Sequence, residues 1–417
     1  KFMDFSNDWM DEFKLRFSLG QTGNAASGAS LYLGSYASGD NYMDMSAITP
    51  STMQLNRLKW ETTTEYNTGL DASFLKGKLR FTVDVYQKYI KDLLQKKVKM
   101  PTSIGYGNGY EVSYMNSGKM TNKGWEFRVD AVPFENRDWR VGFYFNIAHN
   151  ENKITEMPDN YTEENYTFNN GEYAYRREEG RPMGSFYGYR YKGVCQNKDA
   201  TYARDADGNV IKDISGNAIV MRNGTATIAP GDALYEDINH DGVINQYDIV
   251  YLGNSNPRFT GGAGVNVSYK QFKLSAIFYG RYGQDVVNST RLNNESMRGI
   301  DNQSTAVLRR WRNEGDQTDI PRALYGEGYN TLGSDRFVED ASYLRLKSLS
   351  FNYRLPKKII QRWGFSNIDV YVTGYNLFTW TKYTGQDPEV KTENTYARDS
   401  ATTPASIQLV AGFNLSF

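Results

Sequence analysis

The chain has 417 residues and equal numbers of basic and acidic side chains, 48 of each. A net charge of zero without a basic cluster gives no indication of a nucleic-acid partner. The single cysteine excludes an internal disulfide framework, and the lack of any run of about 18 apolar residues excludes a transmembrane helix. The 32 tyrosines, 38 glycines and 11 prolines favour many strands joined by polar loops.

Ten segments alternate apolar and polar residues with the period of two that is typical of strands. In chain order, they cover residues 12–20, 57–75, 78–92, 119–133, 139–155, 259–269, 272–282, 341–355, 367–381 and 406–417. Some are joined by short turns. Others are joined by long connections, which cover 21–56, 93–118, 156–257, 282–340 and 383–404. This succession predicts an all-β, antiparallel outer-membrane barrel with short periplasmic turns and long extracellular loops.

The two faces of the expected strands differ in charge. Trp125 and Phe127 point to one face, whereas Glu126 and Arg128 point to the other. A soluble β-sandwich also alternates in this way, so alternation alone leaves both folds open. An unbroken apolar face opposite a charged one favours a barrel with a lipid-facing surface and a wet lumen. The last strand is about as long as a bilayer crossing and ends on Phe417, which suggests the closing strand of such a barrel. With the short turns assigned to the periplasm, this strand descends, which predicts a periplasmic C-terminus.

Two further elements are expected within the long connections. Residues 184–196 have the pattern of a strand. A helical piece is expected at 304–312, where Val307, Leu308 and Trp311 form a small apolar stripe. Such a stripe is more typical of packing within a loop than of a binding helix.

Residues 237–248 read Asp-Ile-Asn-His-Asp-Gly-Val-Ile-Asn-Gln-Tyr-Asp and match a twelve-residue calcium loop. Calcium needs six or more oxygen ligands on a tightly curled chain, and Gly242 at loop position 6 permits the turn. Ile244 at position 8 is expected to pack inward. The expected ligands are the side chains of Asp237, Asn239, Asp241, Asn245 (through water) and Asp248, and the carbonyl of Val243.

The alternative interpretation of this loop is an Asp- and Asn-rich turn without a metal. Position 12 is Asp248 rather than the longer glutamate, which favours a permanently filled structural Ca²⁺ site over a signalling switch. We therefore expect residues 156–257 to form an extracellular excursion that contains a calcium loop.

No motif indicates catalysis. His149 and His240 are far apart in sequence, and His240 occupies a non-ligand position of the calcium loop. The sequence has no nucleophile elbow, HExxH motif, P-loop or paired CxxC motif. We therefore expect a protein that is not an enzyme.

Five stretches carry a resemblance to one known family. Residues 116–126 read Asn-Ser-Gly-Lys-Met-Thr-Asn-Lys-Gly-Trp-Glu, and residues 146–154 read Asn-Ile-Ala-His-Asn-Glu-Asn-Lys-Ile. Residues 253–262 follow the calcium-like loop, and residues 341–347 and 373–389 begin or form later strands. Taken in order and over nearly the whole chain, these stretches resemble the SusC/RagA family of TonB-dependent outer-membrane transporters.

The resemblance implies a 22-stranded, plugged barrel, of which residues 1–417 would form a C-terminal part of about ten strands. It also implies an N-terminal plug that contacts TonB. No signal peptide precedes Lys1, so we expect a mature or truncated chain that lacks upstream parts. The plug and the remaining strands would belong to another chain or to a segment not included here, because ten strands alone leave two open edges in lipid.

The family implies import of oligosaccharides or peptides across the bacterial outer membrane, with a SusD-like surface lipoprotein as a lid. Connections 156–257 and 282–340 would contact the lid and part of the cargo. Tyr187, Tyr189 and Trp311 are candidate substrate contacts, with packing as the alternative for each. The other functions left open are a passive porin and a calcium-stabilised adhesin or carbohydrate-binding protein.

Overall fold

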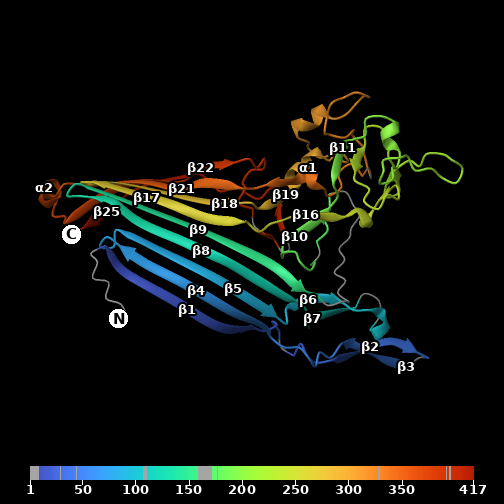
Figure 1. Cartoon of the computed structure of the whole chain (residues 1–417), viewed down its shortest axis with the longest axis horizontal. Helices are drawn as coiled ribbons and strands as arrows, with labels where there is room; N and C mark the ends of the chain where they lie inside the picture. The colour runs from blue at the N-terminus through green and yellow to red at the C-terminus, as the bar shows by residue number, and fades with distance from the viewer. Residues whose placement is uncertain are drawn as a thin grey trace.

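The computed structural model is a curved antiparallel sheet with the long connections gathered at one end, called the loop end below (Figure 1). It describes residues 9–28, 30–43, 45–106, 110–157, 171–175, 177–326, 329–390, 392–393 and 396–417. The short turns lie at the opposite end of the sheet, called the turn end (Figure 1).

Ten strands form the main sheet, and their order across it follows the chain. They are β1 (Met10–Asn24), β4 (Glu61–Phe74), β5 (Leu79–Lys91), β8 (Lys119–Glu135), β9 (Trp139–Glu156), β17 (Phe259–Tyr269), β18 (Phe272–Tyr282), β21 (Tyr343–Arg354), β22 (Asn367–Thr381) and β25 (Gln408–Ser416). Every neighbouring pair is antiparallel. All ten predicted strands are confirmed, and β1 and β25 form the two edges of the sheet.

The apolar face of the sheet, called the outer face below, is exposed. Leu15 on β1 is 70% exposed and Phe413 on β25 is 67% exposed. The opposite, inner face carries ion pairs, in which the Arg16 guanidinium lies 2.7 Å from Asp71 and 2.9 Å from Asp84. Exposed apolar rows are unfavourable in water and favourable in lipid, so the predicted division between a lipid face and a wet face matches the structure.

Aromatic side chains lie at both ends of the outer face. At the turn end, the rings of Trp139 and Tyr269 are 4.3 Å apart between centroids. At the loop end, the ring centroid of Trp125 on β8 lies 6.2 Å from that of Phe259 on β17, and β9 lies between these two strands. Two aromatic rows that bound an apolar band are typical of strands that cross a membrane.

Three glycines of the sheet are covered by the rings of tyrosines that lie directly opposite them on neighbouring strands. A Cβ atom at Gly264 would lie 2.0 Å from the Tyr144 ring, so the ring covers the glycine backbone. An aromatic ring laid over a strand glycine shields its backbone and fixes the register of the pair. The three pairs are Gly124 with Tyr86, Gly264 with Tyr144 and Gly412 with Tyr371.

The long connections after β9, β18 and β22 form a second unit at the loop end, called the lobe below (Figure 1). Its strands are β10 (Ser185–Gly188), β11 (Tyr191–Val194), β12 (Arg222–Asn223), β13 (Ala226–Thr227), β14 (Ala233–Tyr235), β15 (Val243–Ile244), β16 (Val250–Asn254), β19 (Asp285–Asn288), β20 (Val338–Asp340), β23 (Thr392–Glu393) and β24 (Tyr396–Asp399). Its helices are α1 (Ser289–Glu295) and the 3₁₀ turns η2 (Asp199–Thr201), η3 (Gln246–Asp248), η4 (Thr305–Arg309) and η5 (Asp335–Phe337).

Smaller elements complete the described chain. Two hairpins extend the loop end of the sheet, namely β2 (Ser35–Tyr42) with β3 (Met45–Thr52) and β6 (Leu94–Lys99) with β7 (Glu111–Asn116), the latter holding η1 (Thr102–Ile104). The turn between β21 and β22 holds α2 (Lys357–Ile360) and η6 (Gln361–Trp363). Within the described residues, no helix combines the length and apolar character that a membrane span requires.

The lobe has a buried apolar core of its own. Tyr187, Ile244 and Leu332 are 0% exposed and belong to one cluster, while Phe186 and Phe337 belong to a second. A core of this kind stabilises a unit in water by removing apolar surface from solvent.

The structure corrects one element prediction and refines another. Residues 184–196 form two strands rather than one, because β10 pairs with β16 whereas β11 pairs with β14. The helical piece expected at 304–312 is the shorter 3₁₀ turn η4. Val307 is buried there, but Leu308 is 65% exposed, so the apolar stripe is packed only in part.

Candidate metal loop and surfaces of the loop end

Residues 237–248 form a curled loop that the lobe core holds in place. Ile244 is 0% exposed and belongs to the core, as predicted for position 8. β15 pairs in parallel with β12, which ties the loop to a neighbouring segment. Gly242 has a φ of +81°, and a Cβ atom there would lie 3.0 Å from the Cβ of Ala203. The tight turn predicted at position 6 is therefore confirmed.

The first half of the loop is curled by its own acidic side chains. The Gly242 amide donates to Asp237 Oδ2 at 2.8 Å, and the Val243 amide donates to Asp241 Oδ1 at 2.7 Å. Asn239 Nδ2 donates to Asp241 Oδ2 at 2.9 Å. These side-chain oxygens therefore line a tight turn, as an oxygen-ligand loop requires.

Asp248 closes the second half of the loop from a fully buried position. Its two oxygens accept the backbone amides of Ile238 and Asn245, each at 2.8 Å. Burial raises the pKa of the Asp248 carboxyl above its usual range, and the nearby charge of Asp237 acts in the same direction. A bound cation would offset both effects.

The donor chemistry of the loop fits calcium, because every candidate ligand is an oxygen. Within the described residues, however, no three His, Cys, Asp or Glu side chains are gathered closely enough to hold a metal ion. A calcium site would therefore depend on the Asn239 and Asn245 side chains and the Val243 carbonyl together with the carboxylates. Asn245 Nδ2 donates to that carbonyl at 3.0 Å.

The three candidate substrate contacts lie in or against the lobe interior. Tyr187 and Tyr189 are 0% and 1% exposed and pack in the same core cluster. Trp311 is half-buried, and its ring lies against the backbone of Gly231, where an added Cβ would be 2.4 Å away. In this arrangement, the structure places these side chains in packing positions.

A polar cleft in the lobe was not predicted from the sequence. It has a volume of about 800 Å³ and is rich in amide side chains, with Arg298 and Tyr329 on its walls. The run Asn293-Asn294 at the end of α1 is the signal that could have indicated it. The carboxylates of Glu172 and Asp301 also line it. Together, these amide, guanidinium, phenol and carboxylate groups suit the hydroxyl or peptide groups of a polar oligomer.

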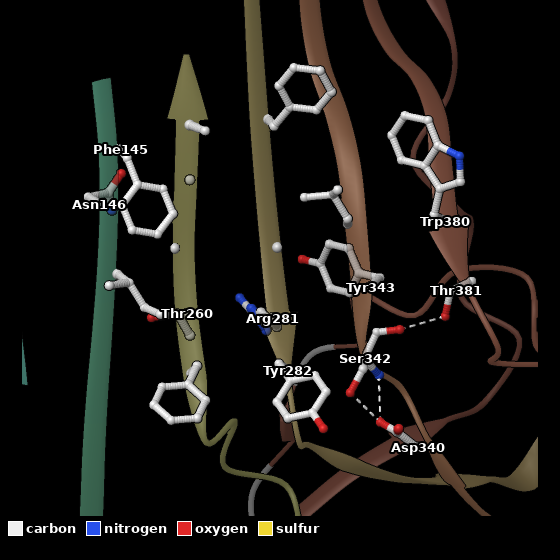
Figure 2. A pocket seen from close by; sticks show the side chains of 18 of the residues that line it. Phe145, Asn146, Thr260, Arg281, Tyr282, Asp340, Ser342, Tyr343, Trp380 and Thr381 are labelled. Carbon is white, nitrogen blue, oxygen red and sulfur yellow. Dashed lines mark hydrogen bonds between the residues drawn. The ribbon is translucent and has the colours of Figure 1, made fainter. Parts of the chain in front are cut away.

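A second hollow lies on the outer face at the loop end and has a volume of about 670 Å³. Figure 2 shows Phe145, Tyr282 and Trp380 around it. Gly261 and Gly280 lie between these side chains and leave the space open. Its lining is mostly apolar, which suits contact with lipid, and polar residues such as Arg281, Asp340 and Tyr343 border it.

The side chains most often used in catalysis have structural contacts. His149 Nδ1 lies 2.6 Å from the Arg258 carbonyl, and His240 Nδ1 lies 3.0 Å from the Arg204 carbonyl. Cys195 is buried, and burial raises the pKa of its thiol to about 11, which keeps it unreactive at neutral pH.

Comparison with known proteins gives consistent matches. Residues 4–377 match the family described as TonB dependent receptor-like, beta-barrel. The chain is similar to TonB-dependent receptor P3 of Formosa agariphila, with 31% identity over 92% of this chain and 36% of that protein. It is similar to TonB-dependent receptor SusC of Bacteroides thetaiotaomicron, with 27% identity over 98% of this chain and 38% of that protein.

A solved structure, the RagAB peptide transporter, is also similar to the chain. The TM-score is 0.72 at 26% identity, over 99% of this chain and 42% of that chain. The chain therefore spans less than half the length of the relatives that it matches.

Proposed function

The chain belongs to the TonB-dependent receptor-like β-barrel family, as a SusC/RagA-like barrel portion, and we propose that it forms part of an outer-membrane importer. The proposed cargo is oligosaccharide or peptide, and the proposed energy source is TonB. The proposal requires a plug, further barrel strands and a SusD-like surface lipoprotein in addition to residues 1–417. It assigns no enzymatic activity to the chain.

The observation that carries the proposal is the contrast between the two faces of the ten-stranded sheet. One face is apolar, exposed and bounded by aromatic rows, and the other carries ion pairs such as that of Arg16 with Asp71. A wall with these faces separates lipid from an aqueous lumen. Because outer-membrane barrels have short periplasmic turns and longer extracellular loops, the proposal puts the turn end and the C-terminus in the periplasm and the lobe outside the cell.

The lobe supplies the features that an importer needs beyond a wall. The lobe presents the polar cleft beside Arg298 and Tyr329 at the loop end, where a lidded cargo would enter. One similar structure supports a peptide cargo, because it is that of a peptide transporter. A cleft with amide and phenol groups accepts either oligomer.

Transport by the full-length protein tests the proposal. Cells that lack the gene should regain growth on a peptide or oligosaccharide only when both the full-length gene and TonB are present. The purified protein should carry a surface lipoprotein with it. A steady, TonB-independent ion conductance in planar bilayers would show a passive porin instead, and isolation of the protein without detergent would show a soluble binding protein.

We also propose that residues 237–248 bind a structural Ca²⁺ through Asp237, Asn239, Asp241, Val243, Asn245 and Asp248. The buried Asp248 carboxylate beside Asp237 supports the proposal, because a cation would stabilise both charges. Metal analysis of the purified full-length protein should find one calcium for this loop, and Asp241→Ala should remove it. An Asp241→Ala protein with an unchanged calcium content and unchanged protease resistance of the lobe would contradict the site.

A further inference from the structure

A group of cationic and tyrosine side chains lies on the inner face of the sheet, where β18 and β21 meet the lobe. In the strand register, Tyr279 lies opposite Arg345 and Arg281 lies opposite Tyr343. A bulge leaves Lys347 as an extra residue on β21. Bulges often redirect a side chain beside a functional site. We call this group the inner cation patch, which comprises Tyr279, Arg281, Tyr343, Arg345 and Lys347.

The two aromatic rings hold the three cations side by side. The Arg281 guanidinium lies 5.9 Å from the centroid of the Tyr279 ring, and the Lys347 ammonium lies 5.7 Å from the same centroid. The Arg345 guanidinium lies 5.3 Å from the centroid of Tyr343. Because cations over aromatic faces are attracted to the ring, the patch is a single packed unit.

Two of the three cations are bound to the connection after β22. Arg345 donates to Glu389 Oε2 at 2.9 Å and also contacts Asp387, and its side chain is only 3% exposed. Lys347 lies 2.8 Å from the same Glu389 oxygen, but its side chain is 32% exposed. Arg345 therefore anchors the lobe to the strand, whereas Lys347 keeps donors free for another partner.

Arg281 is the cation of the patch that forms no ion pair in the described part of the chain, although the Glu389 carboxylate acts on it electrostatically. Its Nε donates to the Tyr279 hydroxyl at 3.2 Å, and none of the ion pairs among the described residues includes it. Its two terminal nitrogens keep the planar, paired N–H groups that match both oxygens of a carboxylate. A half-buried guanidinium in this state is ready to bind an anion.

Tyr343 supplies a second unsatisfied group at the same place. The residue is 5% exposed, and within the described chain its buried hydroxyl has no hydrogen-bond partner. Leaving a buried hydroxyl unpaired is costly, so the Tyr343 hydroxyl has a hydrogen bond to offer to a ligand or a water molecule. Figure 2 shows the Tyr343 side chain on β21 beside the neighbouring strand that carries Arg281. Residues directly opposite in a ladder have Cβ atoms about 5 Å apart, which brings both groups within reach of one carboxylate.

We propose that Arg281, the Tyr343 hydroxyl and Lys347 form a subsite for a carboxylate of the cargo on the inner wall. The proposal rests on the function proposed above and narrows it to oligomers that carry a carboxylate. Arg281 binds both carboxylate oxygens, Tyr343 donates its hydroxyl, and Lys347 adds a second positive charge. The carboxylate comes from a peptide terminus or acidic side chain, or from a uronic acid of a glycan, and these sources are separated by the test.

The experiment measures binding to the full-length protein in detergent with four defined probes. The peptide probes are tetra-alanine with a free C-terminal carboxylate and tetra-alanine amide. The sugar probes are trigalacturonate and maltotriose. We expect one acidic probe to bind about tenfold or more tightly than its neutral counterpart, as hydrogen bonds to a charged group allow. The pair that shows this difference identifies the source of the carboxylate.

Arg281→Gln should remove the preference for the acidic probe, so that the two members of the pair bind with similar affinity. Tyr343→Phe keeps the ring and should lower the affinity for the acidic probe about three- to tenfold, since it removes one hydrogen bond. The matched control is Arg128→Gln, which removes a cation from another part of the inner face, where Arg128 pairs with Asp130. This control should keep the full preference. A heat-dependent shift of the folded barrel on gels verifies that each variant is folded.

Two outcomes of the binding experiment overturn the subsite. One is equal binding of acidic and neutral probes by the wild-type protein, and the other is an undiminished preference in Arg281→Gln. TonB-dependent uptake of both members of a pair at equal rates would reject the subsite and keep the proposed function. If wild-type cells showed no TonB-dependent uptake of any of these probes, the proposed function itself would be rejected.

Discussion

The sheet and the lobe use the same apolar residue types in opposite ways. Leu15 and Phe17 on β1 are 70% and 73% exposed, whereas Phe186 and Ile244 in the lobe are 0% exposed. The lobe removes its apolar side chains from water by burying them in a core. The sheet removes its apolar side chains from water by placing them against lipid. The exposure of an apolar side chain therefore indicates which solvent its surroundings provide, and mutations in the two regions should have different consequences.

The largest expected effect comes from the lobe core. Phe186 contacts the rings of Tyr173 and Tyr396 at centroid distances of 6.3 and 5.5 Å. Phe186→Ala should destabilise the lobe by about 3–5 kcal/mol, because it removes a buried ring and leaves a cavity. Limited proteolysis of the full-length protein in lipid should show faster cleavage of the lobe. The heat-dependent mobility shift of the barrel should stay unchanged.

Phe17→Ala is the matched control for this prediction, because it truncates the same residue type on the outer face. Lipid chains can occupy the space of the lost ring, so the lobe should keep its protease resistance. Equal loss of resistance in Phe17→Ala and Phe186→Ala would contradict the proposed difference between the two regions.

The second prediction concerns charge on the outer face. Leu15→Arg should cost about 2–4 kcal/mol if Leu15 lies near the middle of the membrane. Ser18→Arg places the same side chain on the inner face, which already carries Arg16, and should cost little. The measurement is the denaturant midpoint of the folded full-length barrel in lipid vesicles. Equal midpoints for the two variants would reject the assignment of the faces.

The sheet could be predicted from the sequence because its information is local. Alternation with a period of two, as in Trp125 to Arg128, fixes both the strand and its faces, and short turns fix the pairing of neighbours. The ten strands and their order followed from these rules alone.

Much of the lobe could not be predicted, because its contacts join residues distant in sequence. Glu295 and Arg336 form a buried ion pair at 2.7 Å across 41 residues, and nothing near either residue indicates the other. The division of 184–196 into two strands depends on partners at β14 and β16. The calcium loop was recognisable because its ligand spacing is local, but the full burial of Asp248 depends on the core around it.

The third prediction tests whether the sheet also has positions that tolerate no added volume. Gly264→Val should cost about 1–3 kcal/mol, because its side chain would displace the Tyr144 ring. Gly142→Val is the matched control, since an added Cβ there has no neighbour closer than 3.9 Å. The barrel's midpoint in denaturant should fall for the first variant and not for the second. Recovery of stability in Gly264→Val combined with Tyr144→Ala would confirm the cause.

The smallest expected effect is a difference in pH dependence between two acidic turns of the lobe. Burial raises the pKa of Asp248, whereas backbone hydrogen bonds, first that of Asn217, hold the pKa of the exposed Asp213 below its usual range. With a chelator present, hydrogen exchange of amides 238–245, after correction for the intrinsic rate, should slow as the pH falls from 7 toward about 4. Exchange of amides 215–217, after correction for the intrinsic rate, should accelerate below about 4.

The opposite signs follow from proton linkage. Folded Asp248 binds a proton more tightly than unfolded Asp248, so acidification toward the unfolded pKa of about 3.9 stabilises the metal-free loop. Folded Asp213 binds a proton less tightly than in the unfolded chain, so its contribution is lost as the pH falls through its folded pKa. Calcium should reverse the first trend, because protonation of Asp248 removes a ligand. If exchange at both turns changed in the same direction as the pH falls, the burial argument would be contradicted. If the pH dependence of exchange at amides 238–245 were the same with and without calcium, the metal site would be contradicted.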